Sequence, residues 1–259
     1  MPWTFAHPAA VIPLRRFCPG RLHFAALVIG ALTPDLGYYV HLFSLATYAH
    51  TFPGSIVVCI PAGLAGVGCF YLFRKPLCHL LPEPHRSSLM PLTTSPAPLH
   101  IGRLFAATAS VAVGAWSHIA WDSFTHRTGW IVTQYPLLQE PAFTIAGVHL
   151  PTYHVLQHLS TLIGVAALAA TYYFWLRRRG IASIFSLTRE DAWRYACIIG
   201  LLLVSLAIAL PLAAKTAAVF NGYLAIRVFI FRAAVYGVAS FALLLLTAAV
   251  FSYAMRREV

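Results

Sequence analysis

Long stretches without a charged residue constrain the fold of this chain more than any other feature. They are Gly54–Phe73, Leu104–Ser117, Leu159–Leu176, Tyr195–Ala214 and Ala233–Phe251. A bilayer is crossed by ~20 apolar helical residues; four stretches have about this length, and the shorter Leu104–Ser117 continues into a further apolar segment. Charged residues make up 10% of the chain, against ~25% in soluble domains. The sequence therefore predicts an all-α, polytopic integral-membrane helical bundle.

A sixth apolar stretch, Leu22–Phe43, is interrupted by Thr33-Pro34-Asp35. Upstream of it, Pro8–Phe17 is too short to span, and Cys18-Pro19-Gly20 is typical of a turn. We expect a hairpin or broken helix that brings His7 beside Asp35, since two short antiparallel helices return the chain to its starting depth. A single span over Leu22–Phe43 is the alternative, and it leaves His7 on the opposite side. The hairpin raises the expected number of membrane-embedded elements to about six.

The basic residues alternate along the chain and predict an orientation. The net charge is +11, but the basic residues gather in every second connecting segment, which argues against nucleic acid as a partner. The basic segments contain Arg15, Arg16, Arg21; Arg74, Lys75, Arg86, Arg103; Arg177, Arg178, Arg179, Arg189, Arg194; and Arg256, Arg257. The alternate segments contain Arg127 and Lys215. By the positive-inside rule we expect a cytoplasmic-membrane protein with a cytoplasmic C-terminus.

The strongest chemical motif is the segment from Trp116 to His126. His118, Asp122 and His126 are spaced four residues apart, so an α-helix places them on one face. An unpaired carboxylate in a membrane costs at least ~2.5–3.5 kcal/mol, which Asp122 must offset with a cationic partner. A bound metal ion is the partner that this face predicts.

Further candidate ligands come from distant segments. They are His7, Asp35, His50, and the pair His154 and His158, again four residues apart. A single histidine in an apolar helix is more often a packed polar residue, but two such pairs together with two aspartates in apolar surroundings favour a metal. Imidazole and carboxylate ligands suit zinc, and these residues suffice for one to three ions. The five cysteines are scattered and are interpreted as small buried residues.

The remaining segments have a simpler interpretation. Arg74–Arg103 contains six prolines and predicts an irregular cytoplasmic loop, with His79, His85 and His100 in solvent. Residues 127–153 form the long outer loop. We predict one integral-membrane domain over 1–259, with the metal site in 1–176 and a scaffold of two helices in 177–259.

Metal sites that lack thiolates and keep carboxylates are typically catalytic, because an open position activates water. Asp122 and Asp35 are therefore the expected catalytic carboxylates, activating a water on the metal. Arg127 is a candidate for binding an anionic group, with a plain interfacial anchor as the alternative.

Several motifs resemble those of a bacterial integral-membrane family of unknown function, related to membrane-bound metal-dependent hydrolases. The matching segments are Thr4–Ala9, Leu27–Asp35, His50-Thr51, Ser117–His126 and Leu156–His158. This resemblance implies a site assembled from these residues in a bacterial inner membrane.

A looser similarity links the order of ligands to zinc-dependent phospholipase C. That family has an Asp, a His about fourteen residues later, then His-x-x-x-Asp, another His, and His-x-x-x-Glu. Here the order is Asp35, His50, His118-x-x-x-Asp122, His126, and His154-x-x-x-His158, so His158 replaces the glutamate. The similarity implies phosphoester hydrolysis.

The leading hypothesis is a metal-dependent hydrolase of a phosphoester in a lipid or lipid-linked substrate, with its site facing the outer half of the membrane. Its partners would be membrane lipid and a lipid or small-molecule substrate. The alternative is a metal-ion or proton-coupled transporter that uses the same His/Asp cluster. A third hypothesis, haem ligation by paired histidines, leaves the aspartates unexplained. A protein with no bound ligand is a fourth. The sequence leaves the oligomeric state undetermined.

Overall fold

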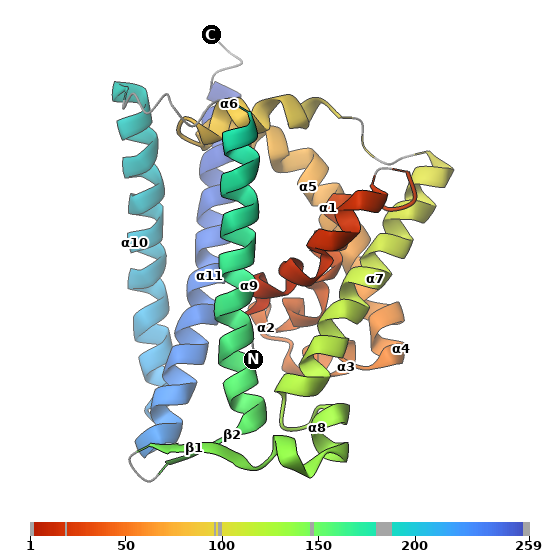
Figure 1. Ribbon diagram of the computed structural model, residues 1–259. Helices are drawn as coiled ribbons and strands as arrows, with labels where there is room; N and C mark the ends of the chain where they lie inside the picture. The colour runs from red at the N-terminus through yellow and green to blue at the C-terminus, as the bar shows by residue number, and fades with distance from the viewer. Residues whose placement is uncertain are drawn as a thin grey trace. The chain divides into compact units, whose positions relative to one another are not determined.

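The computed structural model describes residues 3–18, 20–95, 97, 100–145, 148–179 and 188–255. Arg256, Arg257 and the C-terminus, whose side of the membrane the sequence predicts, lie outside these residues. The all-α prediction is confirmed: apart from one antiparallel hairpin of β1 (Pro141–Ile145) and β2 (Val148–Pro151), the described chain is almost entirely helical. Figure 1 shows the elements.

The helical elements, in chain order, are η1 (Thr4–Phe17), α1 (Phe24–Gly30), η2 (Thr33–Asp35), α2 (Leu36–Tyr39), α3 (Phe43–Ala49), α4 (Phe52–Gly54), η3 (Ser55–Cys59), α5 (Ile60–Leu80), α6 (His85–Leu89), η4 (Met90–Thr94), α7 (Ile101–Thr125), α8 (Trp130–Gln134), η5 (Pro136–Leu138), α9 (Thr152–Arg178), α10 (Arg189–Ala217) and α11 (Gly222–Met255).

Within the described residues, five helices are long and apolar enough to cross a membrane. They are Phe52–Leu80, Ile101–Gln134, Thr152–Arg178, Arg189–Ala217 and Gly222–Met255. Each contains one of the five charge-free stretches of the sequence. The chain is therefore a multi-pass membrane protein by the length and composition of its helices.

The chain divides into two compact units. Unit 1 contains residues 1–37, 42–68 and 97–175, and unit 2 contains residues 38–41, 69–96 and 176–259. Unit 2 thus takes up residues 38–41 and 69–96 besides the two C-terminal helices, and the division of the sequence after residue 176 stays a prediction.

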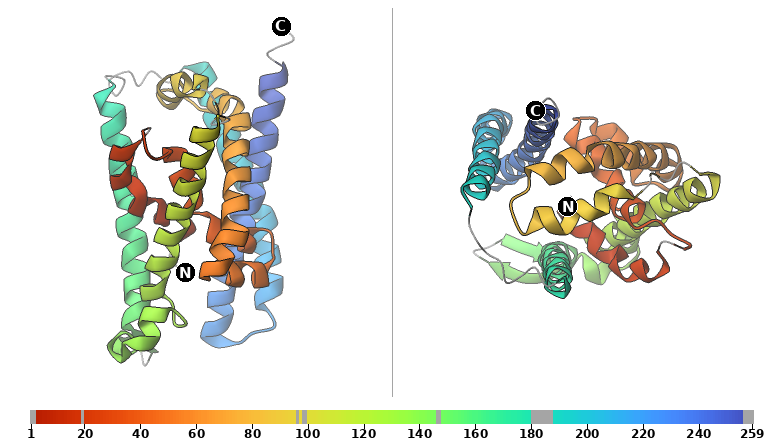
Figure 2. Two further views of the ribbon diagram at one scale, coloured as in Figure 1. Left: turned by 90° about the vertical axis from the view of Figure 1, so that its right-hand side faces the viewer. Right: turned by 90° about the horizontal axis from the view of Figure 1, so that it is seen from above.

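Unit 1 begins with the N-terminal hairpin formed by η1 and α1, which lies beside α7 (Figures 1 and 2). The predicted hairpin is present, but η1 is a 3₁₀ helix that starts at Thr4 and includes His7. The prolines at 8 and 13 lack the N–H groups that an α-helical ladder needs, which accounts for the tighter helix. The alternative of a single span over Leu22–Phe43 is wrong, because α1 ends at Gly30.

Two glycines allow α1 and α7 to pack with their backbones in close approach. A Cβ at Gly30 would overlap the Val111 backbone, and a Cβ at Gly114 would overlap the backbone of Leu27, Gly30 and Ala31. This contact sets the position of the hairpin against the face of α7 that carries His118 and Asp122.

Unit 2 is built on the antiparallel helices α10 and α11 (Figure 2). Buried Asp191 connects α10 to the segment after α5: its Oδ1 accepts from the Glu83 backbone N–H at 3.1 Å and from Arg194 at 3.2 Å. Arg227 and Arg232, which the charge pattern overlooked, lie on α11.

The predicted loop over Arg74–Arg103 is wrong in its first part. Helix α5 continues through Pro76 to Leu80, and α6 and η4 follow. His79 is therefore not a solvent residue: its ring lies 5.1 Å from that of Tyr253. His100 is exposed as expected, and His85 is partly buried.

The glycine contact gives a direct test of the fold. We expect Gly114→Ala to lower the free energy of unfolding by ~1–3 kcal/mol, the usual cost of forcing a methyl group into a packed contact. Gly68→Ala is the matched control, since a Cβ there meets nothing within 4 Å and the substitution favours the helix. Thermal unfolding in detergent measures both variants. Equal stability of the two would contradict the close approach of α1 and α7.

Candidate metal centre

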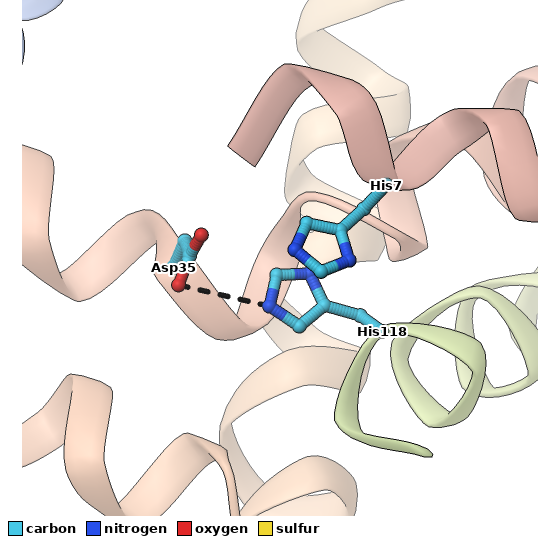
Figure 3. A group of neighbouring side chains, drawn as sticks. All are labelled: His7, Asp35 and His118. Carbon is cyan, nitrogen blue, oxygen red and sulfur yellow. Dashed lines mark ion pairs between the residues drawn. The ribbon is translucent and has the colours of Figure 1, made fainter. Parts of the chain in front are cut away.

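The candidate centre lies entirely in unit 1 and takes its side chains from four segments. His7 comes from η1, Asp35 from the end of η2, His50 from the residue after α3, and His118 and Asp122 from α7. Two overlapping groups, His7 with Asp35 and His118, and His50 with His118 and Asp122, each bring their ligand atoms within 4.8 Å of one another. Figure 3 shows the first group.

Helix α7 supplies one edge of the centre. His118 and Asp122 lie one turn apart on its buried face, with 3.3 Å between His118 Nε2 and Asp122 Oδ2. The four-residue spacing sets this distance, as the sequence predicted.

The N-terminal hairpin brings His7 and Asp35 to the same point. The His7 ring stacks on the His118 ring, with centroids 3.6 Å apart and planes 14° from parallel (Figure 3). His7 Nε2 lies 3.5 Å from Asp122 Oδ1, and His118 Nε2 lies 3.7 Å from Asp35 Oδ1. Residues separated by more than a hundred positions thus share one buried site.

Four of the ligand atoms form an alternating N–O–N–O ring. His50 Nε2 lies 3.4 Å from Asp35 Oδ1 and 3.3 Å from Asp122 Oδ2, and His118 Nε2 closes the ring at 3.7 and 3.3 Å. Ligands at ~2.0–2.1 Å from a tetrahedral ion stand ~3.3–3.4 Å from one another. Charge-assisted N–H···O bonds are shorter, at ~2.7–2.9 Å. The spacing fits a shared ion better than direct hydrogen bonds.

Backbone carbonyls orient two of the imidazoles. His118 Nδ1 lies 2.8 Å from the Ala31 carbonyl at the end of α1, and His50 Nδ1 lies 2.7 Å from the Ala46 carbonyl. A carbonyl oxygen only accepts, so each Nδ1 carries the proton. In the neutral ring each Nε2 then presents its lone pair to the centre, the usual arrangement of a metal-ligating histidine.

A side-chain hydroxyl orients the carboxylate of Asp35. Thr4 Oγ1 donates to Asp35 Oδ2 at 2.5 Å, which leaves Oδ1 facing the two imidazoles. Sequence reasoning assigned no role to Thr4, although it stands three residues before His7 in the same short helix.

The buried atoms of the centre lack hydrogen bonds. They are His7 Nε2, Asp35 Oδ1, His118 Nε2 and both carboxylate oxygens of Asp122. Leaving one such group unsatisfied costs ~1–3 kcal/mol, more when it is charged. Asp35, His118 and Asp122 each contribute one of these atoms to the N–O–N–O ring, where a divalent cation would satisfy them together. The residues therefore fit a metal ion, while His50, 20% exposed, forms the open side.

The other predicted site residues lie at the edge or apart. His126, after α7, has its Nδ1 3.4 Å from Asp122 Oδ1 but also 3.2 Å from the Asp122 carbonyl, and it belongs to neither group. Arg127 is exposed next to it. The structure does not bring His154 and His158 into the two groups; on α9 their ring centroids lie 5.2 Å apart with the planes tilted by 53°.

The comparison with protein-family models shows the family of the chain. Residues 1–250 match the model described as "Domain of unknown function (DUF4184)", so the chain belongs to that family. No curated protein and no solved structure matches the chain. The expected membership of a family of unknown function is confirmed, and no relation to hydrolases or to phospholipase C is shown.

The centre predicts how single substitutions change the metal content. We expect His118→Ala and Asp122→Asn to lose bound zinc after purification, because the first removes an imidazole from the N–O–N–O ring and the second removes the negative charge of its carboxylate. His85→Ala and His154→Ala should keep it. Elemental analysis of the purified variants gives the ratio of zinc to protein. Loss of zinc in His154→Ala would show that His154 on α9 is a ligand after all.

Thr4 predicts a smaller effect on the same measurement. Partners that orient a ligand typically contribute 10–100-fold in metal affinity, so we expect Thr4→Val to weaken zinc binding by ~10–100-fold. Thr108→Val is the control, since Thr108 is partly buried and its hydroxyl donates to the Leu104 carbonyl of its own helix. A chelator competition titration measures both. Unchanged affinity in Thr4→Val would exclude this role for the threonine.

Proposed function

We propose that this member of the DUF4184 family is a membrane-embedded, metal-dependent hydrolase that cleaves a phosphoester of a lipid or lipid-linked substrate. The observation that carries the proposal is the N–O–N–O ring of His50, Asp35, His118 and Asp122, with separations of 3.3–3.7 Å. Its position at the end of an apolar helix supports a substrate that resides in the membrane.

The donor set favours a hydrolytic centre over a structural one. It combines imidazoles with two carboxylates and contains no thiolate, whereas structural zinc sites are usually closed by cysteines. A divalent ion, zinc in our proposal, would polarise the phosphoryl oxygen and lower the pKa of a water. The 20% exposure of His50 leaves one side through which water and the phosphate group enter.

Side chains of the protein would accept the proton that the attacking water releases. Asp122 has its two oxygens directed to different partners: Oδ2 faces His50 and His118, and Oδ1 faces His7 and His126 at 3.5 and 3.4 Å. His7 Nε2 has no hydrogen bond and would accept a proton from the attacking water.

The proposed reaction is the hydrolysis of a phosphoester. The water oxygen bonds to phosphorus, the ester P–O bond breaks, and the alcohol leaves with the proton that His7 received. Arg127, exposed one residue after His126, would contact the anionic substrate. In this proposal the site faces the outer half of a bacterial inner membrane, as the alternation of basic segments favours.

Phosphate release from defined lipids tests the proposal. We expect zinc-loaded protein in lipid nanodiscs to release inorganic phosphate from phosphatidic acid or from a polyisoprenyl phosphate. Asp122→Asn should reduce the rate by ~100-fold or more, because several kcal/mol of transition-state stabilisation depend on the metal. His85→Ala is the control and should retain the wild-type rate. Activity that survives both Asp122→Asn and exhaustive chelation would refute a metal-dependent hydrolysis.

Transport is the competing outcome of the same preparations. Zinc flux into sealed liposomes that depends on Asp122, without phosphate release from either lipid, would assign the cluster to an ion pathway instead. The measurement uses a zinc-sensitive dye inside the liposomes, with His85→Ala again as the control.

A further inference from the structure

A cavity of about 310 Å³ adjoins the metal centre within unit 1. It lies between η1, α7 and α9, and its lining includes Ala6, His7, Trp121, Ile163, Gly164 and Ala167. Gly164 makes the narrow wall: a Cβ there would lie 2.9 Å from the Ala6 carbonyl oxygen, so η1 and α9 approach closely.

His7 connects the cavity to the centre. Of the lining residues in the described part of the chain, it is the one with a titratable side chain, and its Nε2 lies 3.5 Å from Asp122 Oδ1. A molecule that fills the cavity therefore ends against the imidazole that stacks on His118. His7 thus belongs both to the lining of the cavity and to the cluster of candidate ligands.

The cavity offers almost nothing to a polar group. Among the described residues of its lining, the polar side chains besides His7 are Trp121, with an indole N–H, and Ser160, whose hydroxyl donates to the Gln157 carbonyl of its own helix at 3.0 Å. None of these described residues carries a fixed charge, so a headgroup placed here would lose its hydration with little compensation. Hydrocarbon is the chemistry that this lining accepts.

The position of the lining residues favours entry from the bilayer. Ile163 is 67% exposed and Trp121 is 44% exposed, both on helices long enough to span. Ile163 lies eleven residues after Thr152, the first residue of α9, a rise of ~16 Å at 1.5 Å per residue, and so falls near the middle of the span. At that depth the surroundings of an exposed side chain are lipid tails.

We propose that this cavity binds a single hydrocarbon chain of the lipid substrate and thereby places the phosphate group of the substrate at the metal centre. The inference rests on the proposed hydrolase function. It names the part of the protein that would select the lipid substrate. The cavity holds the acyl chain, His7 marks the point where the polar part begins, and the substrate enters laterally from the membrane.

Photolabelling tests the cavity without requiring turnover. The probe is phosphatidic acid with a diazirine in its acyl chain, incorporated into nanodiscs with the zinc-loaded full chain, and labelled residues are identified by mass spectrometry. We expect labels on 6–10 and 160–167 above those on other lipid-facing turns. Ala167→Phe fills the cavity and should reduce this labelling by ~10-fold or more, the range for lost contacts in an apolar pocket.

Ala166→Phe is the matched control, because Ala166 is exposed on α9 and lies outside the lining. It should leave the labelling unchanged. Labels spread evenly over all lipid-facing helices, or equal labelling in both variants, would overturn the inference.

Zinc content, measured on the same samples, separates this inference from the proposed function. Ala167→Phe should keep its zinc, since the substituted residue contacts none of the ring atoms. Zinc-loaded wild type with no excess label in the cavity would overturn the inference and leave the hydrolase standing. Cavity labelling in a protein that binds no zinc would overturn the proposed hydrolase. It would also overturn the assignment of the bound hydrocarbon chain to a substrate.

Discussion

Two carboxylates in an apolar interior, Asp35 and Asp122, are the constraint on which the rest of unit 1 depends. Each is at most 5% exposed, and a charge removed from water at that depth is stable only with a countercharge and hydrogen bonds. The imidazoles around them are oriented by carbonyls that fix the proton on Nδ1, so their lone pairs face the carboxylates. A cation among these groups would supply that countercharge, and the proposed metal site depends on the fold in this way.

The geometry depends equally on residues without functional groups. Gly30 and Gly114 bring α1 against α7 so closely that the Ala31 carbonyl reaches His118. A larger residue at either position would move the hairpin and change the distances between the side-chain atoms of the N–O–N–O ring. The small residues along this contact are therefore part of the candidate site, because they decide whether the segments that carry the candidate ligands meet.

The sequence predicted what depends on local periodicity and missed what depends on packing between elements. The spacing of His118 and Asp122 fixes their common face, and Pro34 with Cys18-Pro19-Gly20 limits the first segment to a hairpin. By contrast, the pair His154 and His158 has the same spacing on α9, yet it joins neither group of candidate ligands. Thr4 and the Ala31 carbonyl were beyond the reach of pattern reasoning, since their roles follow from contacts across distant segments.

The order of the ligands along the chain has a consequence for biogenesis. His7, Asp35 and His50 all lie in the first fifty residues, whereas His118 and Asp122 lie near the far end of α7. Synthesis proceeds from the N-terminus, so the hairpin leaves the ribosome long before its partner helix exists. A hairpin too short to span must wait at the membrane, with Asp35 accessible to water, until α7 is inserted. Insertion of α7 is then the step that commits Asp35 to the interior, and the proposed metal ion could bind only after it.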